Sequence, residues 1–123
     1  MSITLNHTIV PARDKEASAK HFAQLFGVPY QGQMGPFAQV RINDTLTFDF
    51  DDRGSDHFEV HHYAFHVSDE EFDAIFDRVK AAGIKYGSAP WTLEDGQINH
   101  WRGGRGVYFR DLDGHVLELL TRA

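Results

Sequence analysis

Two histidines and one glutamate stand on short β-type segments that are spread over the whole sequence. They are His7, His62 and Glu118. Imidazole nitrogen suits Zn, Ni, Fe and Mn, and a single carboxylate adds negative charge while leaving coordination positions open. Water or a substrate can then bind at the open positions. The three residues therefore predict a site for a divalent metal ion, which would be Fe, Mn, Ni or Zn.

Each of these residues also has an ordinary structural interpretation. A glutamate between Leu117 and Leu119 could pair with an arginine or lie on an exposed strand edge, because burying an unpaired carboxylate is costly. A single strand histidine such as His7 is more often a hydrogen-bonded core or surface residue. An internal repeat favours the metal interpretation, because it makes His7 and His62 equivalent positions.

The repeat is a strand followed by a helix, and it occurs twice. A strand with His7 precedes a helix that ends at Gly27, and a strand with His62 precedes a helix that ends at Gly83. His7 lies 20 residues before the first glycine, and His62 lies 21 residues before the second. The two histidines therefore occupy nearly the same place in two similar units.

Both helices have an apolar stripe, and three strands are expected after each of them. The second helix begins with a capping box, in which Ser68 precedes Glu71 by three residues. The stripes are formed by Ala19, Phe22, Leu25 and Phe26 in the first helix and by Phe72, Ile75, Phe76 and Val79 in the second. The first strand of each half covers 5–10 or 61–67, and the later strands cover 30–34, 37–42, 46–50, 85–88, 107–110 and 115–120.

This order predicts an α+β fold of two tandem βαβββ modules, which form a cupped, mostly antiparallel sheet with the helices outside. We expect a single domain over residues 1–123, with module one at about 1–52 and module two at about 58–123. The acidic stretch 51–56 contains few apolar residues and is the expected joint. One module cannot cover its own sheet, so the pairing of two modules is expected to close a cavity.

Composition and charge exclude several classes of protein. A chain of 123 residues with 41% hydrophobic and 24% charged residues fits one soluble domain. The net charge of -6 and the scattered basic residues give no electrostatic footprint for nucleic acid or for an anionic membrane. There is no cysteine, no charged-then-apolar leader and no apolar run long enough to cross a bilayer. We therefore expect a cytoplasmic protein.

Three segments, 5–7, 62–65 and 108–118, resemble the vicinal oxygen chelate superfamily. That superfamily includes glyoxalase I, fosfomycin-resistance thiol transferases, extradiol dioxygenases and bleomycin-binding proteins. In the family the matching residues, here His7, His62 and Glu118, bind a divalent metal that chelates two neighbouring oxygens of a small substrate. The resemblance implies a metal-dependent lyase, isomerase or ring-cleaving dioxygenase. The alternative is a small-molecule binding protein of the bleomycin-resistance type without catalysis.

The resemblance also implies a homodimer, in which the ligands of one metal site come from one chain or from both. Four positions depart from the patterns of individual branches. Extradiol enzymes usually have a proline at the position of Leu112 and a second-sphere histidine at the position of Thr47. Fosfomycin-resistance enzymes have a threonine at the position of Ile9. The glutamate that glyoxalase I uses as a fourth ligand corresponds to Thr47 or to Asp49, depending on the alignment.

Two further side chains are candidates for proton transfer. Strand alternation places His66 on the same side as His62, and Tyr108 lies on the strand before Glu118. Either could act as a general acid or donate a hydrogen bond to a substrate. The alternatives are a surface histidine at a strand end and a tyrosine that only packs its ring.

The irregular segment 91–105 is the candidate substrate-binding loop. It contains His100, Trp101, Arg102 and Arg105, which combine aromatic surface with positive charge. Such a mixture suits a planar or anionic substrate, and long irregular loops in compact domains often bind ligands. The alternative is a dimer contact or an ordinary surface loop.

Overall fold

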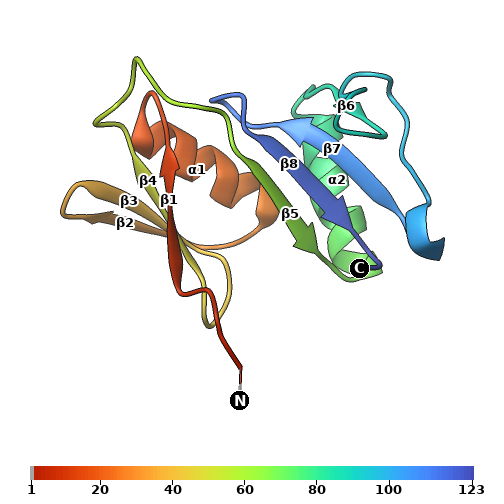
Figure 1. The fold of residues 1–123 in the computed structure, drawn as a ribbon, viewed down its shortest axis with the longest axis horizontal. Helices are drawn as coiled ribbons and strands as arrows, with labels where there is room; N and C mark the ends of the chain where they lie inside the picture. Colours follow the sequence, from red (N-terminus) through yellow and green to blue (C-terminus); the bar gives the residue numbers. More distant parts are fainter. Residues whose placement is uncertain (1) are drawn as a thin grey trace. The chain divides into compact units, whose positions relative to one another are not determined.

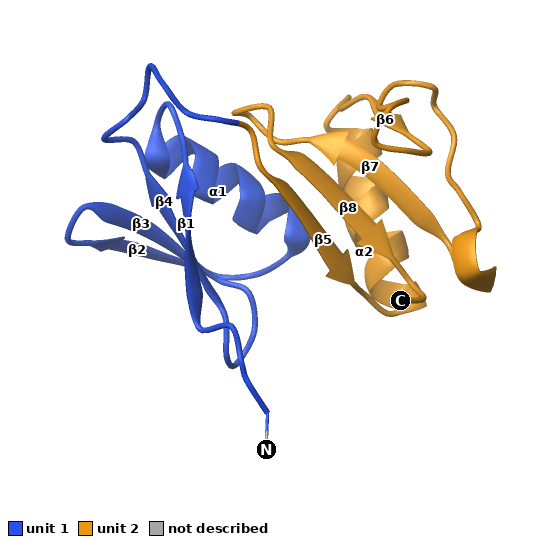
Figure 2. Ribbon diagram, viewed as in Figure 1, with its two compact units in different colours: residues 1–59 blue, residues 60–123 orange. Residues whose placement is uncertain are grey.

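The chain forms two compact units, of which the first ends at Glu59 and the second runs from Val60 to Ala123 (Figure 2). The computed structural model describes residues 2–123. Met1, the first residue of the segment that we expected to contain no leader, lies outside the described residues. Each unit contains one α-helix and one four-stranded sheet, in the order strand, α-helix, strand, strand, strand (Figure 1). The predicted α+β class with two βαβββ modules is confirmed.

The first unit has a sheet with the strand order β1-β4-β3-β2. Its elements are β1 (His7–Pro11), α1 (Lys15–Phe26), β2 (Tyr30–Met34), β3 (Phe37–Arg41) and β4 (Thr47–Asp51). β1 runs parallel to β4, and the other neighbouring strands are antiparallel. The sheet is therefore mostly antiparallel, as the short turns in the sequence predicted.

Apolar residues on alternate positions attach the first sheet to α1. In β4, Phe48 and Phe50 are buried, and their ring centroids lie 5.3 and 6.0 Å from that of Phe22 in the helix. Because successive strand side chains point to opposite faces, Asp49 lies on the face away from α1. The helix stops where the sequence predicted, at Gly27 with a left-handed φ of 68°.

The second unit repeats this arrangement with the strand order β5-β8-β7-β6. Its elements are β5 (His62–His66), α2 (Asp69–Ala81), β6 (Tyr86–Gly87), the short 3-10 helix η1 (Trp101–Gly103), β7 (Gly106–Arg110) and β8 (Val116–Leu120). β5 runs parallel to β8, and β8 is antiparallel to β7. No helix within residues 2–123 is both long enough and apolar enough to cross a membrane.

The local signals around α2 are all realised. The hydroxyl of Ser68 accepts a hydrogen bond from the Glu71 backbone N–H, and the Glu71 carboxylate accepts one from the Ser68 N–H, which confirms the capping box. The helix ends at Ala81, Ala82 is its C-cap, and Gly83 follows with φ 72°. α2 lies along one face of the second sheet (Figure 1). Its residues Phe72, Ile75 and Val79 are buried.

Candidate metal and substrate site

His62 and Glu118 lie beside each other on the adjacent strands β5 and β8. Ala64, two residues after His62, is the register partner of Glu118. His62 Nε2 lies 3.0 Å from Glu118 Oε1, which is hydrogen-bonding distance for an Nε2–H donor. Two atoms that each lie about 2.1 Å from one ion, at an angle of about 90–110°, are about 3.0–3.4 Å apart. The pair therefore has the spacing of neighbouring ligands of a single divalent ion.

Tyr108 supports the carboxylate from the other side. It is the register partner of Glu118 on β7, its side chain is only 3% exposed, and its hydroxyl donates a hydrogen bond to Glu118. Burial, and then the hydrogen bond and charge of Glu118, raise the pKa of Tyr108 far above its usual value, while Arg102 acts weakly in the opposite direction. The phenol therefore stays neutral and remains a hydrogen-bond donor across the physiological pH range.

His62 and Glu118 lie on the face of the second sheet that α2 does not cover (Figure 1). Leu117 and Leu119, which flank Glu118, are buried on the helix side. The side chains of His62 and Glu118 are 44% and 13% exposed. β8 lies between β5 and β7, so Glu118 is not on a strand edge, and its partners are an imidazole and a phenol. The pair is therefore accessible to a ligand yet held by neighbouring groups.

His7 belongs to the first unit, where it is the first residue of β1, as His62 is the first residue of β5. Its side chain is exposed, and its Nδ1 lies 2.8 Å from Asn6 Oδ1. An Nδ1–H that donates to this amide oxygen leaves the lone pair of Nε2 available to a metal, which is how outer groups commonly orient metal-bound histidines. The structure thus brings His62 and Glu118 together, and it places His7 at the equivalent position of the other unit.

Strand register identifies Asp49 as the counterpart of Glu118. Ile9 pairs with Asp49 in the first unit, as Ala64 pairs with Glu118 in the second. Each acidic residue is the third residue of the last strand of its unit. Thr47, the other position that the sequence left open, corresponds to the first residue of β8 instead. Counting residues from the start of each repeated strand would have found this correspondence.

The neighbour of Asp49 is also equivalent to the neighbour of Glu118. Gln39 pairs with Asp49 in the register of β3 and β4, as Tyr108 pairs with Glu118 in the register of β7 and β8. The Gln39 side-chain amide donates a 2.9 Å hydrogen bond to the buried Asp49 carboxylate. Asp49 shares its face with His7, since both alternate with residues on the helix side. Both units therefore present a histidine and a supported carboxylate on the open face of the sheet.

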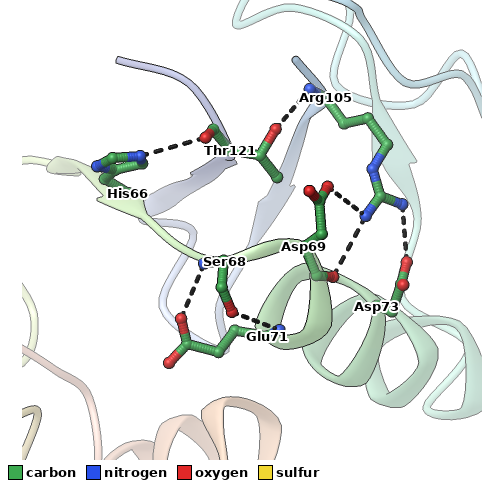
Figure 3. A network of polar contacts seen from close by, with 7 residues as sticks. All are labelled: His66, Ser68, Asp69, Glu71, Asp73, Arg105 and Thr121. Carbon is green, nitrogen blue, oxygen red and sulfur yellow. Dashed lines mark hydrogen bonds and ion pairs between the residues drawn. The ribbon is translucent and has the colours of Figure 1, made fainter.

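The predicted general acid His66 lies at the far end of β5 from His62. Its Nε2 is 3.2 Å from the backbone carbonyl oxygen of Thr121, and its side chain is exposed (Figure 3). Strand alternation puts it on the same face as His62, as predicted from the sequence.

Arg105, a predicted substrate-binding residue, has strong partners within its own unit. Its guanidinium donates to Asp73 at 2.7 Å and to Asp69 at 3.0 Å (Figure 3). It also stacks over the ring of Phe72, 4.4 Å from the centroid. These contacts tie the start of β7 to the first turns of α2.

The other three predicted substrate-binding residues lie at or next to η1, and all three are exposed. The ring of Trp101 lies 6.1 Å from that of Tyr108, so this turn borders the side chain that supports Glu118. Arg102 has a left-handed backbone with φ 57°. His100 immediately precedes the turn and, with Arg105, lines a pocket of about 380 Å³.

A second group of potential ligands lies in the turn between β7 and β8, and the sequence did not single it out. The side-chain ligand atoms of Asp111, Asp113 and His115 all lie within 4.8 Å of one another. Asp111 Oδ1 accepts hydrogen bonds from the backbone N–H groups of Asp113 and His115, and His115 Nδ1 accepts one from the N–H of His61. These bonds close the tight turn at Gly114, where φ is 86°. The group therefore has a structural role that needs no ion.

Tyr63, next to this turn, should make the free energy of unfolding depend on pH in the alkaline range. Its hydroxyl lies 2.6 Å from His61 Nδ1, and burial followed by the charge of Asp111 raises the pKa of Tyr63 to about 12. The unfolded chain loses this proton near pH 10, before the folded chain does. The free energy of unfolding should therefore fall as pH rises from 10 towards 12, with no such effect below pH 10.

Urea unfolding at pH 9 and pH 11 measures this dependence. Tyr63→Phe should reduce the loss of stability between the two values, and Tyr108, whose pKa is raised in the same direction, accounts for part of what remains. An equal loss in the wild type and in Tyr63→Phe would contradict the assignment.

Comparison with known proteins gives a consistent result along the whole chain. A family model described as the Glyoxalase/Bleomycin resistance protein/Dioxygenase superfamily matches residues 4–119. The structure of Oxidase ChaP-H2 has a TM-score of 0.94 and 46% identity, covering 100% of this chain and 96% of that one. The structure of Oxidase ChaP-H1 has a TM-score of 0.92 and 43% identity, covering 99% of this chain and 98% of that one.

A more distant similarity involves the Metallothiol transferase FosB of Lysinibacillus sphaericus (strain C3-41). It is 25% identical over 122 residues, which cover 96% of this chain and 82% of that protein.

Proposed function

Because this chain belongs to the Glyoxalase/Bleomycin resistance protein/Dioxygenase superfamily, we propose that it is a metal-dependent oxidase of a small molecule with two neighbouring oxygens. The observation that carries the proposal is the 3.0 Å pair of His62 Nε2 and Glu118 Oε1, which Tyr108 supports on the open face of the sheet. Two similar chains named as oxidases, at 46% and 43% identity, favour oxidation over the lyase and isomerase alternatives.

The proposed metal ligands are His7, His62 and Glu118, and the proposed ion is Fe(II). Two imidazoles and one carboxylate with open positions are typical of non-haem iron oxygenases, whereas Zn²⁺ has no redox chemistry. The 3.0 Å separation of two of the donors fits a common ion, and the orientation of His7 Nδ1 towards Asn6 is consistent with coordination through Nε2. When bound, iron supplies Lewis acidity and one-electron chemistry.

The remaining residues position the carboxylate and the substrate. The neutral hydroxyl of Tyr108 donates to Glu118 and keeps the carboxylate turned towards His62. His66 is the proposed general acid on the same face of β5. Trp101 and Arg102 are proposed to contact the substrate beside Tyr108, and His100 borders the neighbouring pocket. We also propose that the protein is a cytoplasmic homodimer.

Loss of His62 provides the direct test of this function. Protein reconstituted with Fe(II) under anaerobic conditions should contain one iron per chain and should consume oxygen when catechol is added as a chelating probe. His62→Ala should lose most of its iron and its oxygen uptake. His57→Ala, which changes another exposed histidine, should keep both.

Elemental analysis and an oxygen electrode give the two readouts separately. The proposal would be overturned if the wild-type protein stayed free of iron. It would also be overturned if His62→Ala held as much iron as the wild type. Iron binding at the predicted site without oxygen uptake would instead favour a binding protein without catalysis.

A further inference from the structure

His115 is a buried histidine that the proposed metal chemistry does not use. It immediately precedes β8 and is 0% exposed. Its Nδ1 accepts a 2.8 Å hydrogen bond from the backbone N–H of His61, which immediately precedes β5. An imidazole nitrogen that accepts a hydrogen bond carries no proton, so the ring proton lies on Nε2. The side chain of His115 therefore joins the starts of the two strands that carry His62 and Glu118.

Backbone hydrogen bonds hold both partners of this contact. The carbonyl oxygen of His61 accepts a 2.8 Å hydrogen bond from the N–H of Val116, which is the register partner of His62. Asp111 Oδ1 accepts from the His115 N–H at 2.9 Å, and the Asp111 N–H donates to the His115 carbonyl oxygen at 3.0 Å. β5 lies at the edge of the four-stranded sheet, beside β8 (Figure 1). The start of β5 is thus tied to β8 through residues 115 and 116.

The same contact ties together the three strands that carry the proposed site. Asp111 directly follows β7 and His115 directly precedes β8, so both strands meet β5 here. These strands carry His62, Glu118 and Tyr108. A displacement of β5 along β8 by a fraction of the rise of about 3.3 Å per residue would separate His62 Nε2 from Glu118 Oε1, which now lie 3.0 Å apart. The spacing of the ligand pair therefore depends on how firmly the start of β5 is held.

The first unit shows that the fold itself does not require a histidine at this position. Leu46 immediately precedes β4, as His115 immediately precedes β8. The preceding turns are built in a similar way, because Asn43 Oδ1 accepts a 2.9 Å hydrogen bond from the Leu46 N–H, as Asp111 Oδ1 does from the His115 N–H. A leucine side chain has no atom that accepts a hydrogen bond from the neighbouring strand. The same βαβββ module therefore forms without this side-chain contact.

The two units also differ in the histidine and the carboxylate on the open face of the sheet. In the second unit, His62 Nε2 lies 3.0 Å from Glu118 Oε1. In the first unit, His7 contacts its neighbour Asn6 rather than the equivalent carboxylate of Asp49. The unit that contains the buried histidine is therefore the one in which the imidazole and the carboxylate meet.

We propose that His115 is a positioning residue of the proposed metal site: through Nδ1 it holds the backbone of His61 and thereby fixes His62 against Glu118. The inference rests on the proposed function, because the two side chains that it positions are proposed metal ligands. The alternation of buried residues along β8 continues back to His115, which puts it on the opposite face from Glu118. His115 thus acts through the backbone and not as a ligand.

Two substitutions separate the acceptor nitrogen from the rest of the side chain. Asparagine has an acceptor oxygen at the position of Nδ1, so His115→Asn should keep the hydrogen bond. His115→Leu gives the second unit the residue type that the first unit has before β4, so it should fold but lose the contact. In metal-free protein, NMR should show slow hydrogen exchange of the His61 amide in the wild type and in His115→Asn. Exchange should be about tenfold faster in His115→Leu, because the hydrogen bond is lost.

Binding of Mn(II) measures the effect on the ligand pair. A titration followed by the EPR signal of free Mn(II) gives the Kd of each folded variant. His115→Leu should raise this Kd about tenfold, because changes around metal ligands commonly weaken binding about 10–100-fold, whereas His115→Asn should stay close to the wild type. Val79→Ala is the control for a general loss of stability, because Val79 is a fully buried residue of α2. It should lower the free energy of unfolding and leave the Kd unchanged.

The positioning role and the metal-dependent function fail in different ways. An unchanged Kd in His115→Leu, or an equal rise of the Kd in Val79→Ala, would overturn the positioning role while the metal site stands. Equal exchange of the His61 amide in the wild type and in His115→Leu would overturn it as well. If the wild type bound no Mn(II) but His115→Leu alone accelerated the exchange at His61, the proposed function would be overturned and the hold of His115 on β5 would be supported.

Discussion

Glu118→Gln should remove most of the stabilisation that a bound divalent metal gives to this protein. A ligand at 100 times its Kd stabilises the folded state by about 2.7 kcal/mol. A neutral amide is a much poorer ligand than a carboxylate, and a Kd raised about 100-fold would leave only about 0.4 kcal/mol at the same metal concentration. The amide can still accept hydrogen bonds from His62 and Tyr108, so the metal-free stability should change by less than about 1 kcal/mol.

Urea unfolding with and without Fe(II) or Mn(II), under anaerobic conditions, measures this difference. Glu70→Gln is the matched control, because Glu70 is an exposed carboxylate in the first turn of α2. The control should show the full stabilisation by metal. If Glu118→Gln were stabilised by metal as strongly as the control, Glu118 would not be a ligand.

Gly87→Ala should disrupt the segment that carries Trp91. A Cβ at position 87 would overlap the backbone carbonyl oxygen of Thr92 and lie 2.6 Å from the carbonyl carbon of Leu93. Both obstacles are backbone atoms, so no side-chain rotation can relieve the overlap. We expect a loss of about 1–3 kcal/mol in the free energy of unfolding. Displacement of this segment should also separate Trp91 from Trp101.

The measurement combines urea unfolding with tryptophan fluorescence. Gly54→Ala is the control, because a Cβ there would lie 3.5 Å from the His57 carbonyl oxygen, which is an ordinary contact. It should change stability by less than about 0.5 kcal/mol. If Gly87→Ala kept both its stability and the wild-type fluorescence, the close approach of 92–93 to β6 would not constrain the loop.

The helices and most strands were predictable because their signals are local. The capping box of Ser68 and Glu71 and the left-handed stop at Gly27 involve atoms within one turn of the chain, and both were confirmed. The first strand was expected at 5–10 and is observed at His7–Pro11. The first residue of β1 is set by its pairing with β4, which begins at Thr47. The local sequence around β1 therefore does not contain the information that defines where this strand begins.

The sequence alone determined the residue types, the repeated βαβββ order and the face of each strand on which a side chain lies, because strand alternation and helical spacing are properties of short segments. Only the tertiary structure decided which side chains meet. His62 and Glu118, 56 positions apart, come within 3.0 Å through the register of β5 and β8, and Arg105 is paired with Asp69 and Asp73. Such contacts depend on the order in which distant strands and helices pack, which local periodicity does not contain. The third proposed ligand, His7, remains a prediction of the repeat.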